Sequence, residues 1–212
     1  MPHNRSMRFW DRIAKRYAAR QITDVAAYEA LLADVASRLN PGDRVLEIGC
    51  GTGGTAIRLA SHVASYTATD FSAEMIRIAR SKLAPATLHF ERTDAQRAFD
   101  GAPFDAICAF NVLHLVDDLP GLLRQIHSAL KPGGVLISKT WCFADLGWKF
   151  RLLFAALRLI GMFPSAARLT SASLSEAVTE AGFEIIDQRT FGMHLQNPYS
   201  VAQKFGKARL CP

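Results

Sequence analysis

Hydrophobic and polar positions alternate with a helical period over the first part of the chain. Apolar side chains recur every three to four positions within residues 9–20, which predicts a short helix there. The same spacing continues over residues 25–39, and Thr23 stands at a suitable N-cap position for that second helix. Asn40-Pro41-Gly42 then ends it, because proline and glycine favour a turn. We therefore expect two helices before the first strand.

Beyond this turn, short apolar runs separate segments that have helical spacing. The runs predict five strands, at Arg44–Ile48, Tyr66–Thr69, Thr87–Glu91, Phe104–Phe110 and Val135–Lys139. Helical patterns lie over residues 53–63, after the cap residue Ser72, and around residues 120–130, and a turn at Lys131-Pro132-Gly133-Gly134 precedes the fifth strand. Strand–helix alternation of this kind predicts an α/β fold with a doubly wound, Rossmann-like sheet.

The pattern changes near the end of the chain. Ser173-Leu174-Ser175-Glu176 has the spacing of a capping box, which predicts a helix that begins there and ends at Gly182. Two further strands are predicted at Phe183–Phe191 and Tyr199–Phe205. Their connection is too short for a crossover helix, so we expect an antiparallel hairpin strand at the end of a mostly parallel sheet.

The length of 212 residues, half of them hydrophobic, predicts a single domain with a sheet buried on both faces. We divide residues 1–212 into four parts. They are N-terminal lid helices over 1–40, a cofactor-binding core over 41–140, a helical insertion or cap over 141–171, and a terminal helix and hairpin over 172–205.

The basic residues of the chain are unevenly placed. The formal net charge is +6, and residues 1–20 contain six basic residues against one acid. Residues 147–168 contain four basic residues and residues 201–212 contain three, in both cases without an acid. Such segments indicate an anionic partner or surface, and simple solvated basic faces are the alternative.

Cysteine spacing and hydropathy indicate the compartment. No long apolar run follows the basic N-terminal residues, and no stretch reaches the roughly 18 apolar residues of a membrane span. The four cysteines lie far apart and lack the spacing of a metal site. We therefore expect reduced thiols, no metal and a cytoplasmic location.

The segment Val45–Gly54 joins an apolar run, a carboxylate and a glycine-rich turn that opens a helix. Such a turn presents backbone N–H groups to a nucleotide-like ligand at the carboxyl end of a first strand. The glycine spacing also satisfies the dinucleotide fingerprint, and Asp70 lies near the distance expected of a ribose-binding acid. The loop alone leaves an NAD-dependent oxidoreductase and a methyl-donor enzyme as alternatives.

Further motifs follow this loop in order within residues 40–205. They are Glu47-Ile48-Gly49-Cys50-Gly51-Thr52-Gly53, Asp70-Phe71-Ser72, Thr93-Asp94-Ala95, Phe104-Asp105, Asn111-Val112-Leu113-His114, Leu130-Lys131-Pro132-Gly133-Gly134 and Ala181-Gly182-Phe183. Together they resemble class I S-adenosylmethionine-dependent methyltransferases, of the broad group that includes quinone-ring and lipid methyltransferases. The resemblance implies a terminal antiparallel hairpin strand, S-adenosylmethionine as cofactor, and methyl transfer to a small or amphipathic acceptor.

The resemblance also implies which residues bind the cofactor. They are Tyr17, Glu47, Gly49, Gly51, Gly53, Asp70, Phe71, Met75, Asp94, Ala95 and Asn111. Asp70 can accept both ribose hydroxyls through its two oxygens, and Asp94 can accept from the adenine amino group. Glu47 adds negative charge, which attracts a cationic ligand and repels an anionic pyrophosphate. This favours the methyl donor over NAD. Phe71 and Met75 either form apolar walls for the adenine or pack in the core.

The catalytic requirement is small. The sulfonium is already a good leaving group, so alignment of the acceptor supplies much of the rate. A base is needed only where the acceptor loses a proton, and His114, just beyond the fourth strand, is the candidate. A histidine packed in a turn is the alternative. Trp10 and Tyr17 lie on the first helix, which covers the cofactor as a lid in similar enzymes or else simply docks on the core.

Two segments leave the choice of partner open. Asn197-Pro198-Tyr199 resembles a motif of methyltransferases that act on amino groups, but that motif belongs after the fourth strand, so we expect an ordinary turn and no nucleic-acid partner. Gly147–Phe163 is apolar nearly all round; it either caps the acceptor pocket, contacts an anionic membrane interface, or is a buried helix. A non-catalytic S-adenosylmethionine-binding module is the alternative to an enzyme. The oligomeric state is not predicted.

Overall fold

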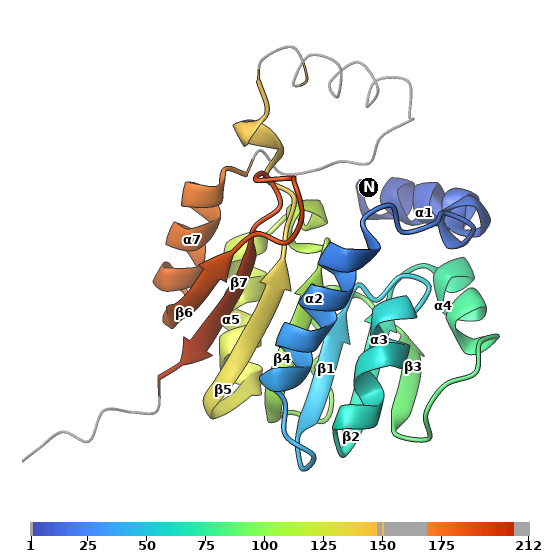
Figure 1. Cartoon of the computed structure of the whole chain (residues 1–212), viewed down its shortest axis with the longest axis horizontal. Coiled ribbons are helices and arrows are strands. Elements are labelled where there is room, and N and C mark those ends of the chain that lie inside the picture. Colours follow the sequence, from blue (N-terminus) through green and yellow to red (C-terminus); the bar gives the residue numbers. More distant parts are fainter. Residues whose placement is uncertain (1, 148–149, 151–168, 206–212) are drawn as a thin grey trace, which may run out of the picture.

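The computed structural model describes residues 2–147, 150 and 169–205, and its centre is a seven-stranded sheet (Figure 1). The strands are β1 (Arg44–Ile48), β2 (Ser65–Asp70), β3 (Leu88–Arg92), β4 (Phe104–Phe110), β5 (Leu130–Lys139), β6 (Phe183–Arg189) and β7 (Tyr199–Lys204). The helices are α1 (Pro2–Ala18), α2 (Val25–Ser37), α3 (Gly54–Leu59), α4 (Ala73–Arg80), α5 (Leu119–Ala129) and α7 (Ser171–Glu180). Short 3₁₀ turns are η1 (Ala60–His62), η2 (Ala95–Arg97), η3 (Leu113–Leu115) and η4 (Phe143–Asp145).

The sheet has the strand order β3-β2-β1-β4-β5-β7-β6. Neighbouring strands from β3 to β5 are parallel, whereas β7 runs antiparallel to both β5 and β6. The predicted α/β class, the doubly wound sheet and the antiparallel hairpin are therefore confirmed. Because β1, β2, β4 and β5 are parallel, their carboxyl ends meet at one edge, where loops can form a ligand site.

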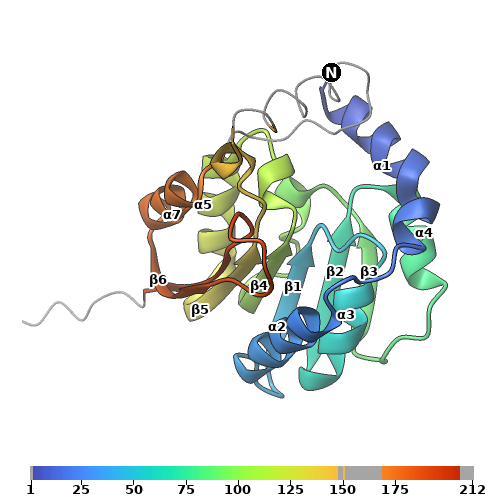
Figure 2. The same cartoon turned by 45° about the horizontal axis from the view of Figure 1, so that its top comes forward.

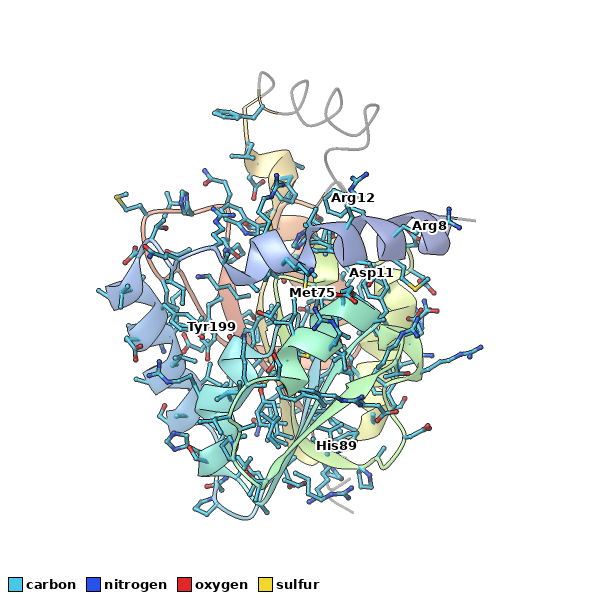
Figure 3. The ribbon with its side chains drawn as sticks, turned by 90° about the vertical axis from the view of Figure 1, so that its right-hand side faces the viewer. Arg8, Asp11, Arg12, Met75, His89 and Tyr199 are labelled. Atoms are coloured by element: carbon cyan, nitrogen blue, oxygen red, sulfur yellow. The ribbon has the colours of Figure 1, made fainter. Side chains whose placement is uncertain are left out.

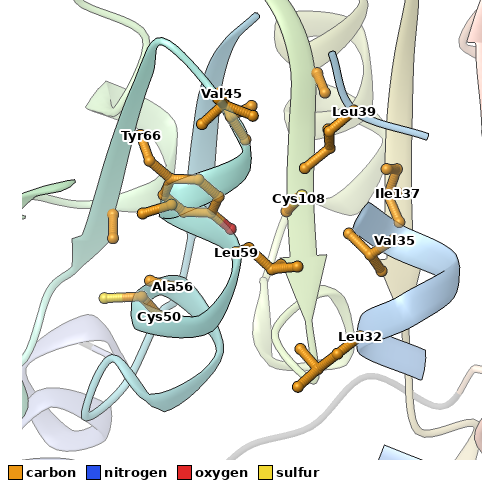
Figure 4. Close-up of a cluster of buried hydrophobic side chains, with 14 of the residues drawn as sticks. Leu32, Val35, Leu39, Val45, Cys50, Ala56, Leu59, Tyr66, Cys108 and Ile137 are labelled. Atoms are coloured by element: carbon orange, nitrogen blue, oxygen red, sulfur yellow. The ribbon is translucent and has the colours of Figure 1, made fainter. Parts of the chain in front are cut away.

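Helices cover both faces of the sheet and bury two apolar clusters. Successive side chains of a strand point to opposite faces, so Val45 packs with α2 and α3 while Leu46 packs with α5 and α7. Figure 4 shows part of the first cluster, with Leu32 and Val35 of α2 among its members. Figures 1 and 2 show α1 lying beside α4 at the edge where the parallel strands end. This places the N-terminal helix over the loops that follow β1 and β2.

Several helix boundaries differ from the sequence prediction. The first helix begins at Pro2 instead of residue 9. The cap of α2 is Asp24, not Thr23, because the Asp24 carboxylate accepts a hydrogen bond from the backbone N–H of Ala27 at 3.0 Å. The helix predicted over 53–63 is divided between α3 and η1.

The terminal helix also begins earlier than predicted. Its capping box joins Thr170 and Ser173, so α7 begins at Ser171 rather than in the predicted box at 173–176. The Thr170 hydroxyl accepts from the Ser173 N–H at 3.0 Å, and the Ser173 hydroxyl accepts from the Thr170 N–H at 2.9 Å. A serine thus fills the third position of the box, where the sequence rule looks for Glu or Gln.

The turn expected before the fifth strand lies within β5 itself. Phe104 pairs with Leu130 and Ala106 pairs with Val135, so the intervening residues bulge out of the ladder. Lys131 is fixed there by Asp105, with its ammonium 2.7 Å from the carboxylate. The strand is therefore longer than the predicted Val135–Lys139.

Candidate active site

The glycine turn after β1 follows a left-handed path. The φ angles of Gly49, Gly51 and Gly53 are 69°, 55° and 75°, a region that side chains rarely adopt. A Cβ on Gly49 would lie 2.5 Å from Cγ2 of Val112, and a Cβ on Gly53 would lie 2.5 Å from the ring of Phe90. Gly49 and Gly53 are therefore required by both conformation and packing, which brings the turn close to the loop after β4.

Asp70 ends β2 and holds this turn in place. One carboxylate oxygen accepts from the N–H of Gly51 at 2.9 Å, and the other accepts from the N–H of Ser72 at 2.8 Å. Burial raises the pKa of the Asp70 carboxyl, and these two hydrogen bonds oppose that rise. Each oxygen keeps further acceptor capacity, so a pair of neighbouring hydroxyls on a ligand can bind here.

Glu47 occupies the next position along the same edge, inside β1. The side chain is 2% exposed and accepts a hydrogen bond from the Tyr66 hydroxyl at 2.7 Å. Burial raises the pKa of Glu47 to about 7, although the Tyr66 hydrogen bond opposes the rise. The part of the chain that the structure describes contains no salt bridge to Glu47. A cationic ligand would therefore supply the counter-charge and favour the ionised form.

These groups line a cavity of about 120 Å³. Its walls come from the glycine turn, the ends of β2 and β4, and α1. The lining residues are Trp10, Tyr17, Glu47, Gly49, Cys50, Gly51, Thr55, Asp70, Phe71, Met75, Phe110, Asn111, Val112 and Leu115. Eight of the eleven residues predicted to bind the cofactor are in this set. Their individual roles in binding stay predictions.

Three predicted cofactor residues lie outside the lining. Gly53 faces the ring of Phe90. The carboxylate of Asp94 accepts from the N–H of Gln96 at 3.0 Å and caps η2. Ala95 packs against the apolar cluster beneath α5. The contact of Asp94 with an adenine amino group stays a prediction.

The first helix closes one side of the cavity and is attached to α4. The Asp11 carboxylate accepts from the Ser72 hydroxyl at 2.6 Å and from the Glu74 N–H at 3.2 Å (Figure 3). Ser72 in turn accepts from the N–H of Met75, as predicted for the cap of that helix. The sequence analysis missed Asp11, although it is the single acid within residues 1–20. On the same helix, Tyr17 remains 44% exposed at the rim.

His114 lies in η3, directly beyond β4, but it does not line the cavity. The side chain is buried, and burial lowers its pKa to about 4, so the imidazole is neutral near pH 7. Its Nδ1 atom has no hydrogen-bond partner in the structure as described. The neighbours Val112 and Leu115 do line the cavity, so the backbone of His114 lies close to it.

A row of aromatic rings continues from His114 along the carboxyl ends of β4 and β5. The His114 ring meets the edge of Phe143 at 5.3 Å between centroids, Phe143 stacks on Trp141 at 5.9 Å, and Trp141 contacts His194 at 5.3 Å. We call these four residues the aromatic wall. The sequence analysis did not identify it, although two aromatic residues directly after a predicted strand end are a usable signal.

Backbone hydrogen bonds join the loop after β4, which lines the cavity, to the segment that leads into the aromatic wall. The N–H of Asn111 donates to the carbonyl of Lys139 at 2.6 Å, and the N–H of Thr140 donates to the carbonyl of Pro198 at 3.1 Å. Thr140 and Asn197 are buried, and Oγ1 of the first and Oδ1 of the second have no hydrogen-bond partner in the described structure. Buried polar atoms without partners are rare in folded proteins, so these two atoms are unusual.

The predicted cap or membrane segment Gly147–Phe163 falls almost wholly outside the described residues. Of its apolar side chains, only Phe150 is described, and that side chain is 54% exposed. Among the described residues, no group of three His, Cys, Asp or Glu side chains could hold a metal ion. Within the same residues, every helix is too short or too polar to cross a membrane.

Comparison with known proteins identifies the family. Residues 14–188 match the family model of the methyltransferase domain. One relative is the highly reducing polyketide synthase ACTTS3 of Alternaria alternata, 35% identical over 137 residues that cover 59% of this chain and 5% of that protein. The chain thus spans only a small part of the curated relatives that it matches.

Solved structures share the fold over most of the chain. A chain of the complex between the Haloferax volcanii Trm112 methyltransferase activator and the putative methyltransferase has a TM-score of 0.70 at 18% identity, with 93% of this chain and 98% of that chain covered. The magnesium protoporphyrin IX methyltransferase of Synechocystis PCC 6803, solved with bound SAH, has a TM-score of 0.67 at 21% identity, with 92% of each chain covered. The choice that the glycine turn left open between NAD and a methyl donor is thereby decided. The chain belongs to the methyltransferase-domain family, as a class I S-adenosylmethionine-dependent methyltransferase.

Proposed function

We propose that the chain transfers the methyl group of S-adenosylmethionine to a small or amphipathic organic acceptor that lies against the aromatic wall. The observation that carries this proposal is the hydrogen bond from Asn111 to Lys139, which joins the cavity lining to the strand that leads into the wall. An acceptor on the wall would face a ligand in the cavity. The polyketide synthase name of the relative supports an organic acceptor.

The cavity residues fit the cofactor. Asp70 is held by two backbone N–H groups with acceptor capacity left for the ribose diol. Glu47 offers a buried carboxylate to a cationic group, and the lining residues Phe71 and Met75 offer apolar surface for the adenine. When bound, the cofactor supplies a methyl group on a cationic sulfur, and the side chains of the protein orient the acceptor toward it.

His114 is the base in this proposal. Its neutral imidazole can take a proton from the acceptor while the acceptor atom bonds to the methyl carbon. Because burial lowers the pKa of His114 to about 4, the imidazole is a weak base and suits an acceptor with an acidic proton. Phenols and carbon atoms between two carbonyl groups belong to that class. The unpartnered Nδ1 atom supports this role because no hydrogen bond within the described structure occupies it.

A cytoplasmic location is also part of the proposal. Cys50, Cys108 and Cys142 are free and buried, an arrangement that fits a reducing compartment.

The test is turnover of the purified chain with methyl-labelled S-adenosylmethionine against a panel of phenols, β-diketones and β-keto thioesters, read by mass spectrometry. His114→Gln should lower kcat by a factor of about 10² to 10⁴ and leave cofactor affinity unchanged. The matched control is His62→Gln, because His62 is an exposed histidine outside the site.

Two results would contradict the proposal. Tight S-adenosylmethionine binding without turnover of any acceptor would favour the non-catalytic binding module. Equal kcat in His114→Gln and in the wild type would contradict the role of His114 as the base, while the proposal of methyl transfer would stand.

A further inference from the structure

The outer face of α1 carries a row of basic side chains. At about 100° of rotation per residue, Lys15, Arg8, Arg12 and Arg16 fall within an arc of about 100° on the helix surface. We call these four residues the basic arc. Figure 3 shows Arg8 and Arg12 directed away from α4, whereas Asp11 points toward it.

The charges of this arc are mostly uncompensated by the rest of the described chain. Arg8, Lys15 and Arg16 are exposed, and none of the hydrogen bonds or salt bridges between described residues involves their side chains. Two exposed arginines elsewhere on the surface do have acidic partners, in the pairs Arg58–Glu29 and Arg77–Glu74. The one acid of the helix, Asp11, is already bound to Ser72.

Exposed apolar side chains follow the arc in the chain. Tyr17 is 44% exposed, and Ile22 and Val25, in the segment that leads from α1 into α2, are 50% and 58% exposed. Exposed cations that are followed in the chain by exposed aliphatic side chains are typical of proteins that lie on the surface of an anionic bilayer. The two aliphatic side chains would not contribute to the binding of a polynucleotide.

We propose that the basic arc of α1 docks on an anionic lipid surface. From Arg8 to Arg16 the helix extends about 12 Å, so its cations can contact several headgroups at once. The apolar face of α1 is occupied by the protein itself, including Ala14, which is fully buried. Because α1 itself offers no free apolar face, docking is mainly electrostatic, with a small apolar contribution from Ile22 and Val25, and it weakens as salt is added.

This orientation has a consequence for the site. Trp10 and Tyr17 of the same helix line the cavity, so a bilayer that contacts the arc lies beside the cavity wall. The inference does not depend on which acceptor is methylated. It can fail while cofactor binding and turnover are retained.

The experiment is flotation of the full chain with vesicles made of equal parts of phosphatidylcholine and phosphatidylglycerol, at low and at physiological salt. The variant Arg8→Glu/Lys15→Glu should lower the partition coefficient onto the vesicles at least tenfold, since each basic residue near such a surface contributes about fivefold to the affinity. Arg8→Gln/Lys15→Gln should give an intermediate loss. The matched control is Arg97→Glu/Arg124→Glu, which makes the same charge change at exposed arginines in η2 and α5.

Thermal unfolding and S-adenosylmethionine calorimetry should be the same for all variants, which separates lost docking from lost folding or a lost site. The inference is overturned if the wild type does not float at low salt. It is overturned equally if the control loses as much binding as the α1 variant, because net charge alone would then explain the effect. Tighter binding to a single-stranded RNA or an acidic protein than to the vesicles would assign the arc to another class of partner.

Discussion

Replacing Glu47 with glutamine removes a titratable group from the cavity and keeps an acceptor for the Tyr66 hydroxyl. In the folded chain, burial raises the pKa of Glu47 from 4.5 to about 7. The folded state therefore binds this proton more tightly than the unfolded state does. The full contribution of this carboxyl to the free energy of unfolding is present below about pH 4.5. That contribution is lost as the pH rises from there through about 7, and the loss totals about 3 kcal/mol.

The Glu47→Gln variant lacks this titration. Its free energy of unfolding, relative to that of the wild type, should increase by about 2 to 3 kcal/mol between about pH 5 and about pH 8.5. Urea unfolding followed by circular dichroism measures this difference. The control is Glu29→Gln, which changes an exposed carboxylate paired with Arg58. The hydrogen bond from Arg58 lowers the pKa of Glu29, so the free energy of unfolding of this variant should show no comparable increase with pH.

Ligand binding gives the opposite sign for the same group. A cationic ligand favours ionised Glu47, so the affinity of the wild type for S-adenosylmethionine should rise with pH through about 7, with release of a proton. Calorimetry in buffers of different ionisation enthalpy reports that proton. If the wild type had a flat stability profile over this range, or if Glu47→Gln kept the pH-dependent affinity, the reasoning would be refuted.

Three further changes test the geometry around this group. Asp70→Ala should weaken S-adenosylmethionine binding by about 1.5–3 kcal/mol, measured by calorimetry, and unchanged affinity would contradict its placement at the ribose. Asp11→Ala removes two hydrogen bonds to α4 and should lower the hydrogen-exchange protection of residues 8–18 by about tenfold, with Asp43→Ala as the control. The same experiment with added cofactor tests the prediction that α1 acts as a lid. Gly49→Ala should destabilise the fold by about 2–5 kcal/mol because strain and the Val112 clash add, whereas Gly51→Ala, which has room, should lose only about 1–2 kcal/mol; equal losses would show that packing is not decisive.

The strands were predictable because both faces of the sheet are buried. Continuous apolar runs then stand out from amphipathic helices, and Phe104–Phe110 is observed with its predicted bounds. Helix starts were less predictable, since several polar residues can compete for a cap. Thr23 was the predicted cap, and the structure places the cap one residue later, at the adjacent polar residue Asp24.

The centre of the site was predictable for a topological reason. Glu47, Asp70 and Asn111 follow or end parallel strands that are neighbours in the sheet, so their positions converge at one edge. Asp11 and Trp141 were missed because their roles depend on contacts with elements distant in sequence. The hydrogen bond of Asp11 to Ser72 spans 61 residues, and no local pattern indicates it.

The protonation states of the site residues are harder to predict from the sequence than their positions. The sequence predicted that Glu47 adds negative charge and that His114 is the candidate base. Burial moves both toward their neutral forms, with pKa values of about 7 and about 4. The site without ligand is therefore less charged than its sequence indicates. A cationic ligand favours the ionised form of Glu47, which in turn binds the ligand. Cofactor binding and the charge of Glu47 are in this way one coupled equilibrium, and the balance between them follows from burial, which only the folded structure determines.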